Sequence, residues 1–316
     1  MALSTRKPYT DIQTQAWFDA WLPAKAIPYT RLARFDRPIG AWLLFIPGLW
    51  SLCLSALSPA TQPPFSAVVE LILLFFVGAI TMRAAGCLVN DLWDQDLDRQ
   101  VARTAGRPLA SGALTRREAA IFLVVLLAIA FAVVIYMPPL VLGLAMISLV
   151  FVGTYPLAKR FTHWPQAMLG LTFNFGALMG AAAVTNTIPV WSMLLYAGCF
   201  FWIIGYDTIY AHQDREDDLS IGIKSTALLF GDKTRAAVRA LYFAAALFWA
   251  CAFYLAQVGF IGWIGLVAGV GTLMWQVRTL DIHDAEKCLA LFKFSAWTGW
   301  TIGGGLILDW LVPLMI

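Results

Sequence analysis

The chain has 316 residues, of which 60% are hydrophobic and only 13% are charged. Soluble domains are usually about 25% charged and 45–50% apolar, so this composition excludes an ordinary soluble protein and predicts an all-α polytopic membrane protein. The five cysteines are scattered and odd in number, which argues against a disulfide framework, and the net charge of +3 gives no sign of a nucleic-acid partner.

The N-terminal segment, residues 1–30, lacks the apolar core of a secretory signal peptide, and we expect it to be a cytoplasmic tail. Apolar runs of bilayer-spanning length follow it. They cover residues 39–57, 67–90, 119–137, 139–157, 165–187, 189–211, 237–257, 259–277 and 290–314. We therefore predict about nine transmembrane helices in a bundle around a central cavity, as one transmembrane domain over residues 1–316.

The 22 Lys and Arg residues follow a clear pattern along these runs. They precede the first run or lie near the inner ends of the later runs, after the second, fourth, sixth and eighth, and Arg83 is the exception because it lies deep inside a run. Cations concentrate on the inner side of membrane proteins, so the N-terminus is predicted to lie inside. We expect a bacterial cytoplasmic (inner) membrane or a mitochondrial inner membrane, with the acidic clusters described below on the cytoplasmic or matrix side.

The second run ends in an acidic cluster whose helical spacing divides its members. At 100° per residue, one face of about 100° carries four side chains of the cluster. These are Asn90, Asp91, Asp94 and Asp98. Asp96 projects to the opposite side and is left out of the predicted ligand set.

Arg83 lies seven residues before Asn90, on the same predicted helix face and about 10 Å deeper. An ionisable residue within a membrane segment usually marks a functional site. A guanidinium suits a carboxylate group of a substrate through paired hydrogen bonds. A structural ion pair with a helix acid is the other interpretation, and the sequence leaves both open.

The sixth run is followed by a second acidic cluster. Asp207, Asp214 and Asp218 fall within about 40° of one another if the helix continues beyond the run. Glu216 then points away from them.

Carboxylates that converge on one face repel one another unless a cation offsets their charge. Oxygen ligands suit a hard ion such as Mg²⁺, which proteins bind through one or two carboxylates with water and substrate phosphates. Two such clusters can bracket a diphosphate, whose remaining oxygens suit the nearby cations. These are Arg99, Arg103, Arg107, Lys159, Arg160, Arg215 and Lys224. The alternatives are a solvated acidic loop and a cation-coupled transporter, although a transporter's acids are expected at mid-membrane rather than at helix ends.

These motifs resemble those of the UbiA superfamily of intramembrane aromatic prenyltransferases. The N-D-x-x-D-x-x-x-D motif stands at residues 90–98, and a second D-x-x-x-D motif stands at residues 214–218. Four further segments appear in the family's order. They are RFDRPIG (34–40), RPLASG (107–112), TYPLAKR (154–160) and GIKST (222–226).

The resemblance implies Mg²⁺-dependent transfer of a polyprenyl group from polyprenyl diphosphate to an aromatic acceptor in the lipid bilayer. The motifs most resemble the branch that prenylates 4-hydroxybenzoate ortho to its hydroxyl in ubiquinone biosynthesis. Naphthoate, homogentisate or haem acceptors are the alternatives within the superfamily.

The resemblance and the helix-face argument together give the expected site. The predicted metal ligands are Asn90, Asp91, Asp94, Asp98, Asp214 and Asp218. The predicted substrate-binding residues are Arg83 for the acceptor carboxylate, with Arg107, Tyr155, Lys159 and Lys224 for the diphosphate and substrate. Asp94, Asp98, Asp214 and Asp218 are also expected to be catalytic, and Asp207 is a hypothetical acceptor of the phenolic or ring proton.

Overall fold

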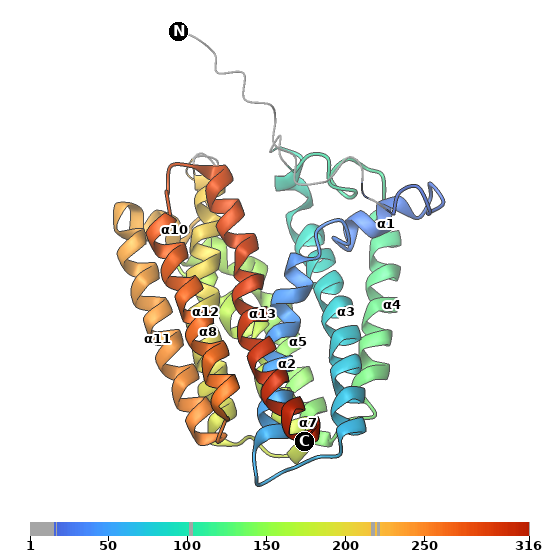
Figure 1. Ribbon diagram of the computed structural model, residues 1–316. Helices are drawn as coiled ribbons and strands as arrows, with labels where there is room; N and C mark the ends of the chain where they lie inside the picture. Colours follow the sequence, from blue (N-terminus) through green and yellow to red (C-terminus); the bar gives the residue numbers. More distant parts are fainter. Residues whose placement is uncertain (1–15, 17, 101–103, 216–218, 220–221, 316) are drawn as a thin grey trace. The chain divides into compact units, whose positions relative to one another are not determined.

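The structure is a computed structural model that describes residues 16, 18–100, 104–215, 219 and 222–315. Every regular element within these residues is a helix (Figure 1). The predicted all-α membrane fold is therefore confirmed.

The membrane helices agree closely with the apolar runs. Within the described residues, eight helical segments are long and apolar enough to cross a bilayer. They are α2 (Ile39–Leu57), α3 (Phe65–Asp98), α4 (Arg116–Val134), α5 (Pro139–Phe161), α6 with α7 (Pro165–Phe173 and Phe175–Thr185), α8 (Val190–Ala211), α10 with α11 (Thr226–Phe230 and Thr234–Leu255) and α12 (Phe260–Thr279). The ninth predicted run lies in α13 (Ala285–Met315), which is long enough, but whose threonines, glycines and Asp309 make it less apolar.

Two helices differ from the predicted runs. α3 continues beyond its apolar part to Asp98, so the first acidic cluster is helical. The fifth run is divided between α6 and α7 at Asn174, whose side-chain amide donates to the Gly170 carbonyl oxygen at 2.7 Å. A side chain that bonds to its own backbone competes with regular helix geometry. The mean hydropathy of this run is that of a single membrane span, so it gives no sign of such a break.

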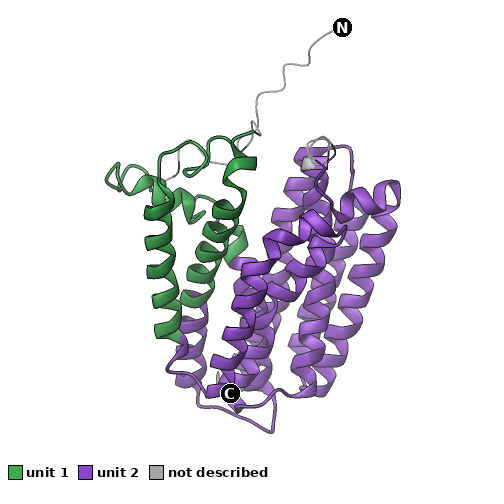
Figure 2. Ribbon diagram, turned by 180° about the vertical axis from the view of Figure 1, so that it is seen from behind, with its two compact units in different colours: residues 1–41, 77–133 green, residues 42–76, 134–316 purple. Residues whose placement is uncertain are grey.

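The described chain divides into two compact units, each built from two stretches of sequence (Figure 2). The first unit comprises residues 1–41 and 77–133, and therefore holds α1 (Ile27–Leu32), the C-terminal part of α3 and α4. Its core joins these helices to the segment between α3 and α4, because Leu32, Leu88, Leu109 and Leu126 are buried in one cluster. The apolar contacts of this core fix the charged end of α3 against that segment.

The second unit comprises residues 42–76 and 134–316. In it α8 packs along α11, and α12 packs along α13 (Figure 1). Trp50, Trp202 and Trp249 are fully buried, and the Trp50 and Trp202 rings stack with centroids 5.7 Å apart. Aromatic packing of this kind holds helices together where water cannot drive their association.

Candidate active site

The C-terminal end of α3 carries a buried network of acids and arginines within the first unit. Arg34 Nη2 donates to both carboxylate oxygens of Asp91, at 3.1 and 3.2 Å. Arg107 Nη1 donates to Asp91 Oδ1 at 3.1 Å and to Asp98 Oδ2 at 2.8 Å. These charge-assisted bonds offset the repulsion between carboxylates on one helix face.

The segment that carries Arg107 is tied to α3 by further hydrogen bonds. Gln95 Nε2 donates to the Leu109 carbonyl oxygen at 2.9 Å, and Arg99 Nε donates to the Ala110 carbonyl oxygen at 3.2 Å. Asp96 pairs with Arg99 on the exposed side of the helix, as its projection predicts. The backbone near Arg107 is therefore held at several points.

Asp94 lies one turn from both Asp91 and Asp98 and is 2% exposed, whereas Asn90 is half-buried. Within the described residues, no three His, Cys, Asp or Glu side chains gather closely enough to form a ready metal cage. Mg²⁺ does not require one, since proteins hold it with one or two carboxylates while water and phosphate oxygens complete its shell. The oxygen donors of Asn90, Asp94 and Asp98 therefore fit a magnesium ion that binds together with a diphosphate.

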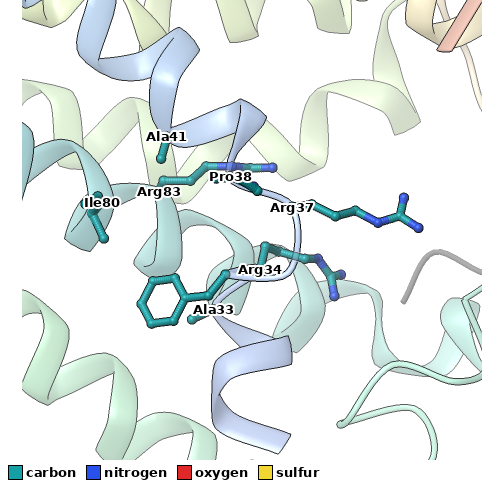
Figure 3. A pocket seen from close by; sticks show the side chains of 8 residues that line it. Ala33, Arg34, Arg37, Pro38, Ala41, Ile80 and Arg83 are labelled. Atoms are coloured by element: carbon teal, nitrogen blue, oxygen red, sulfur yellow. The ribbon is translucent and has the colours of Figure 1, made fainter. Parts of the chain in front are cut away.

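Arg83 lines a cavity of about 100 Å³ in the first unit, together with Arg34 and Arg37 (Figure 3). Its guanidinium runs past Pro38, at the point where α2 begins (Figure 3). A Cβ atom on Gly40 would lie only 2.1 Å from Arg83 Nε, so the glycine makes room for this side chain. Apolar side chains and three arginines line the cavity, so it suits a small organic anion.

The second unit holds Lys159 and Lys224, which meet at the segment that precedes α10. Lys224 donates through its backbone N–H to the Lys159 carbonyl oxygen at 3.1 Å and through Nζ to the Phe161 carbonyl oxygen at 3.2 Å. Tyr155 lies one turn before Lys159 on α5, and both side chains are half-buried. The structure therefore brings Lys159 and Lys224 together.

This segment is also fastened to α8. The hydroxyl groups of Thr208 and Thr226 are hydrogen-bonded at 2.6 Å, and the Thr226 backbone N–H donates to Gln166 Oε1 at 3.0 Å. Asp207 is the residue before Thr208 and is half-buried. The bond between the two threonines thus links the lysine-bearing segment to the helix turn that carries Asp207.

The second acidic cluster is not one continuous α-helix. α8 ends at Ala211, and a 3₁₀ turn, η1 (His212–Asp214), follows it, so the α-helix that the predicted arc assumes does not continue to Asp214. Asp218 and the side chain of Asp214 lie outside the described residues.

His212 is the first residue of η1, and its side chain is buried. Its Nε2 lies 2.9 Å from Thr234 Oγ1. Burial, followed by the positive charges of Arg215 and His283, lowers the pKa of His212 to about 4. The imidazole is therefore neutral at neutral pH.

Three features of these sites were not predicted from the sequence: the pairing of Arg34 with Asp91, the fit of Gly40 to Arg83, and the bond between Thr208 and Thr226. Arg34 and Gly40 begin and end the RFDRPIG segment, and Thr226 ends the GIKST segment. The motifs thus contained a signal, but it did not specify which contacts these residues make.

Apolar helices whose charged ends carry acids, arginines and lysines define a multi-pass membrane enzyme for an anionic substrate. The comparison with known families agrees: the UbiA prenyltransferase family matches residues 44–299. The chain belongs to this family, which confirms the resemblance in its motifs.

Similar proteins extend over nearly the whole chain. The mitochondrial 4-hydroxybenzoate polyprenyltransferase of Caenorhabditis elegans is 40% identical over 97% of this chain and 85% of its own length. The 4-hydroxybenzoate geranyltransferase 2 of Lithospermum erythrorhizon is 38% identical over 94% of this chain and 95% of its own length.

Solved structures have the same fold. A UbiA homolog from Aeropyrum pernix K1 matches with a TM-score of 0.71 and 26% identity, over 85% of this chain and 97% of that one. A UbiA homolog from Archaeoglobus fulgidus bound to GPP and Mg²⁺ matches with a TM-score of 0.59 and 18% identity, over 89% of this chain and 99% of that one.

Proposed function

We propose that this chain transfers a polyprenyl group from polyprenyl diphosphate to the ring carbon of 4-hydroxybenzoate that lies ortho to the hydroxyl, as a step of ubiquinone biosynthesis. The observation that carries the proposal is the 40% identity, over 97% of the chain, to an enzyme named for 4-hydroxybenzoate and a polyprenyl group. The cavity beside Arg83 supports it, because a guanidinium in a small pocket suits the carboxylate of a benzoate.

The reaction exchanges one bond for another. The allylic C–O bond of the donor breaks, and its electron pair leaves with the diphosphate. The acceptor's ring carbon then forms a C–C bond to the allylic carbon and loses its proton to a base. Asp207 is our candidate for that base, because it is a half-buried carboxylate on α8.

Mg²⁺ is the expected cofactor, and its ligands would be Asn90, Asp94, Asp98, Asp214 and Asp218. The chemistry it supplies when bound is stabilisation of the negative charge on the departing diphosphate. The solved Archaeoglobus homolog that binds GPP and Mg²⁺ supports this choice of ion.

The cationic side chains have separate tasks in this proposal. Arg107, Lys159 and Lys224 bind diphosphate oxygens, and Tyr155 assists from the turn before Lys159. Arg83 holds the acceptor carboxylate. The donor and the acceptor thus bind to different arginines, which lets each affinity be measured separately.

The membrane location that we propose is based on the membrane-spanning helices and on the distribution of cations between them. The chain is a multi-pass membrane protein. We place it in a bacterial cytoplasmic (inner) membrane or a mitochondrial inner membrane, with its N-terminus and its acidic clusters on the inner side, because its cations follow alternate helices.

The test uses membranes that contain the chain, Mg²⁺ and a radiolabelled prenyl diphosphate. 4-Hydroxybenzoate is offered beside homogentisate and a dihydroxynaphthoate, with geranyl and longer diphosphates in parallel. We expect label only in prenylated 4-hydroxybenzoate. Label in another acceptor instead would overturn the choice of acceptor, and no transfer to any acceptor would overturn the enzyme assignment.

A further inference from the structure

Arg34 has a backbone conformation that its residue type does not favour. Helix α1 ends in a Schellman motif, in which the Arg34 N–H donates to the Arg31 carbonyl oxygen at 3.1 Å and the Phe35 N–H donates to the Thr30 carbonyl oxygen at 3.0 Å. Arg34 occupies the left-handed position of this motif, with φ +58°. Glycine is the usual residue there, since a side chain makes this conformation less stable. An arginine at this position therefore suggests that its side chain is needed.

The side chain of Arg34 makes a buried ion pair. Its Nη2 donates to both oxygens of Asp91, and the two side chains are 8% and 1% exposed. A buried charge whose partner is removed is strongly unfavourable, so each of these residues fixes the other. The pair joins the end of α1 to the end of α3, across 57 residues of sequence.

Asp91 in turn contacts Arg107. Oδ1 of Asp91 accepts from both Arg34 and Arg107, and Oδ2 accepts from Arg34. A carboxylate has about four lone-pair positions, so three accepted hydrogen bonds leave little capacity for a metal ion. Two guanidinium groups also offset its negative charge. Asp94 lies one turn further along the same face of α3.

We propose that Arg34 and Asp91 form a positioning pair: Arg34 fixes Asp91, and Asp91 holds the Arg107 guanidinium in the position from which it binds the diphosphate. Asp91 then acts on substrate binding and is not a magnesium ligand, although it stands within the acidic motif. The inference rests on the proposed function only in that a diphosphate is the ligand of Arg107.

The test compares three amide substitutions in the purified full-length chain. Mn²⁺ binding is followed by electron paramagnetic resonance in the presence of inorganic diphosphate, and KM is measured for the prenyl diphosphate. Asp91→Asn is expected to raise that KM about tenfold, the effect of one lost charge-assisted hydrogen bond, and to change Mn²⁺ affinity by less than about twofold. Asp94→Asn should weaken Mn²⁺ binding about tenfold or more.

Asp96→Asn is the matched control. Asp96 belongs to the same helix end but is 75% exposed and pairs with Arg99, so its substitution should change neither measurement. If Asp91→Asn weakens Mn²⁺ binding as much as Asp94→Asn does, Asp91 is a metal ligand and the proposal is wrong. An unchanged KM in Asp91→Asn refutes it as well.

Two substitutions of Arg34 test the same chain of contacts from its other end. Arg34→Met should raise the prenyl diphosphate KM as much as Asp91→Asn does, and the double variant should be no worse than either, because both act through Arg107. Arg34→Lys keeps the charge and should recover part of the affinity. Additive effects in the double variant, or no recovery with lysine, contradict the proposal.

Thermal unfolding of every variant separates binding from folding, and if Asp91→Asn does not fold, Arg34→Lys supplies the same two measurements. Wild-type protein that binds Mn²⁺ and diphosphate as expected but prenylates no 4-hydroxybenzoate would refute the proposed function alone.

Discussion

Gly40→Ala should displace Arg83 while leaving the fold almost unchanged. The alanine Cβ would lie 2.1 Å from Arg83 Nε, 2.7 Å from its Cζ and 2.9 Å from its Nη2. Real Cβ atoms keep at least about 3.0 Å from such neighbours, so the guanidinium must move by roughly an ångström. It is the end of a flexible side chain, and its movement costs the fold little. Alanine is also the better helix former, by about 0.5–1 kcal/mol.

The expected loss follows from the proposed contact. A hydrogen bond to a charged group contributes about 1.5–3 kcal/mol, and a displaced guanidinium loses at least one of the two bonds of a paired contact. Since about 1.4 kcal/mol corresponds to a factor of ten, KM for 4-hydroxybenzoate should rise between about tenfold and a hundredfold. KM for the prenyl diphosphate should not change, because other residues bind it.

The assay is steady-state transfer in detergent or nanodiscs, with each substrate varied in turn and thermal unfolding as the measure of stability. Gly86→Ala is the control: Gly86 lies on α3 three residues after Arg83, and a Cβ there meets nothing within 4 Å. An unchanged KM for 4-hydroxybenzoate in Gly40→Ala, with normal folding, would refute the role of Arg83. Equal increases in both KM values would show that the variant disturbs the whole site instead.

Three further substitutions test the remaining assignments. Asp94→Ala should lower kcat by more than about a hundredfold. Residues that hydrogen-bond to a metal ligand cost about 10–100-fold in metal affinity or activity when they are lost, and loss of a direct ligand should cost more. Near-normal turnover at saturating Mg²⁺ would exclude a ligand role for Asp94. Lys224→Met should raise the KM for the prenyl diphosphate by about tenfold, the effect of one lost charge-assisted hydrogen bond, and should leave the KM for the acceptor unchanged. A rise only in the KM for the acceptor would contradict the assignment of Lys224 to the diphosphate. Thr208→Val removes the hydrogen bond to Thr226, a net loss of about 0.5–1.5 kcal/mol, so the KM for the prenyl diphosphate should rise by about a few fold. Wild-type kinetics would show that the bond between Thr208 and Thr226 does not position Lys224.

The membrane helices were largely predictable because their apolar lengths are fixed by the bilayer. α2 begins and ends where the first apolar run does, at Ile39 and Leu57. The extension of α3 to Asp98 was foreseen only as a helical face, since the charged residues beyond residue 90 end the apolar signal. The break at Asn174 was missed because the run around it is long enough and apolar enough to be one membrane helix.

The site was predictable where spacing along one helix decides the geometry. The exposed position of Asp96 and the shared helix of Arg83 and Asn90 both follow from periodicity. The pairing of Arg34 with Asp91 depends on a left-handed backbone residue and on a tertiary contact across 57 residues, and neither is encoded in local patterns.

The network of Arg34, Arg107, Asp91 and Asp98 gives this protein its own counterions at the end of α3. A buried acidic cluster normally depends on its metal for neutrality, but here guanidinium groups already balance two of the carboxylates. Chelators should therefore stop turnover without unfolding the chain. We therefore expect that the protein can be extracted and stored in buffers containing EDTA, and that adding magnesium afterwards restores its activity.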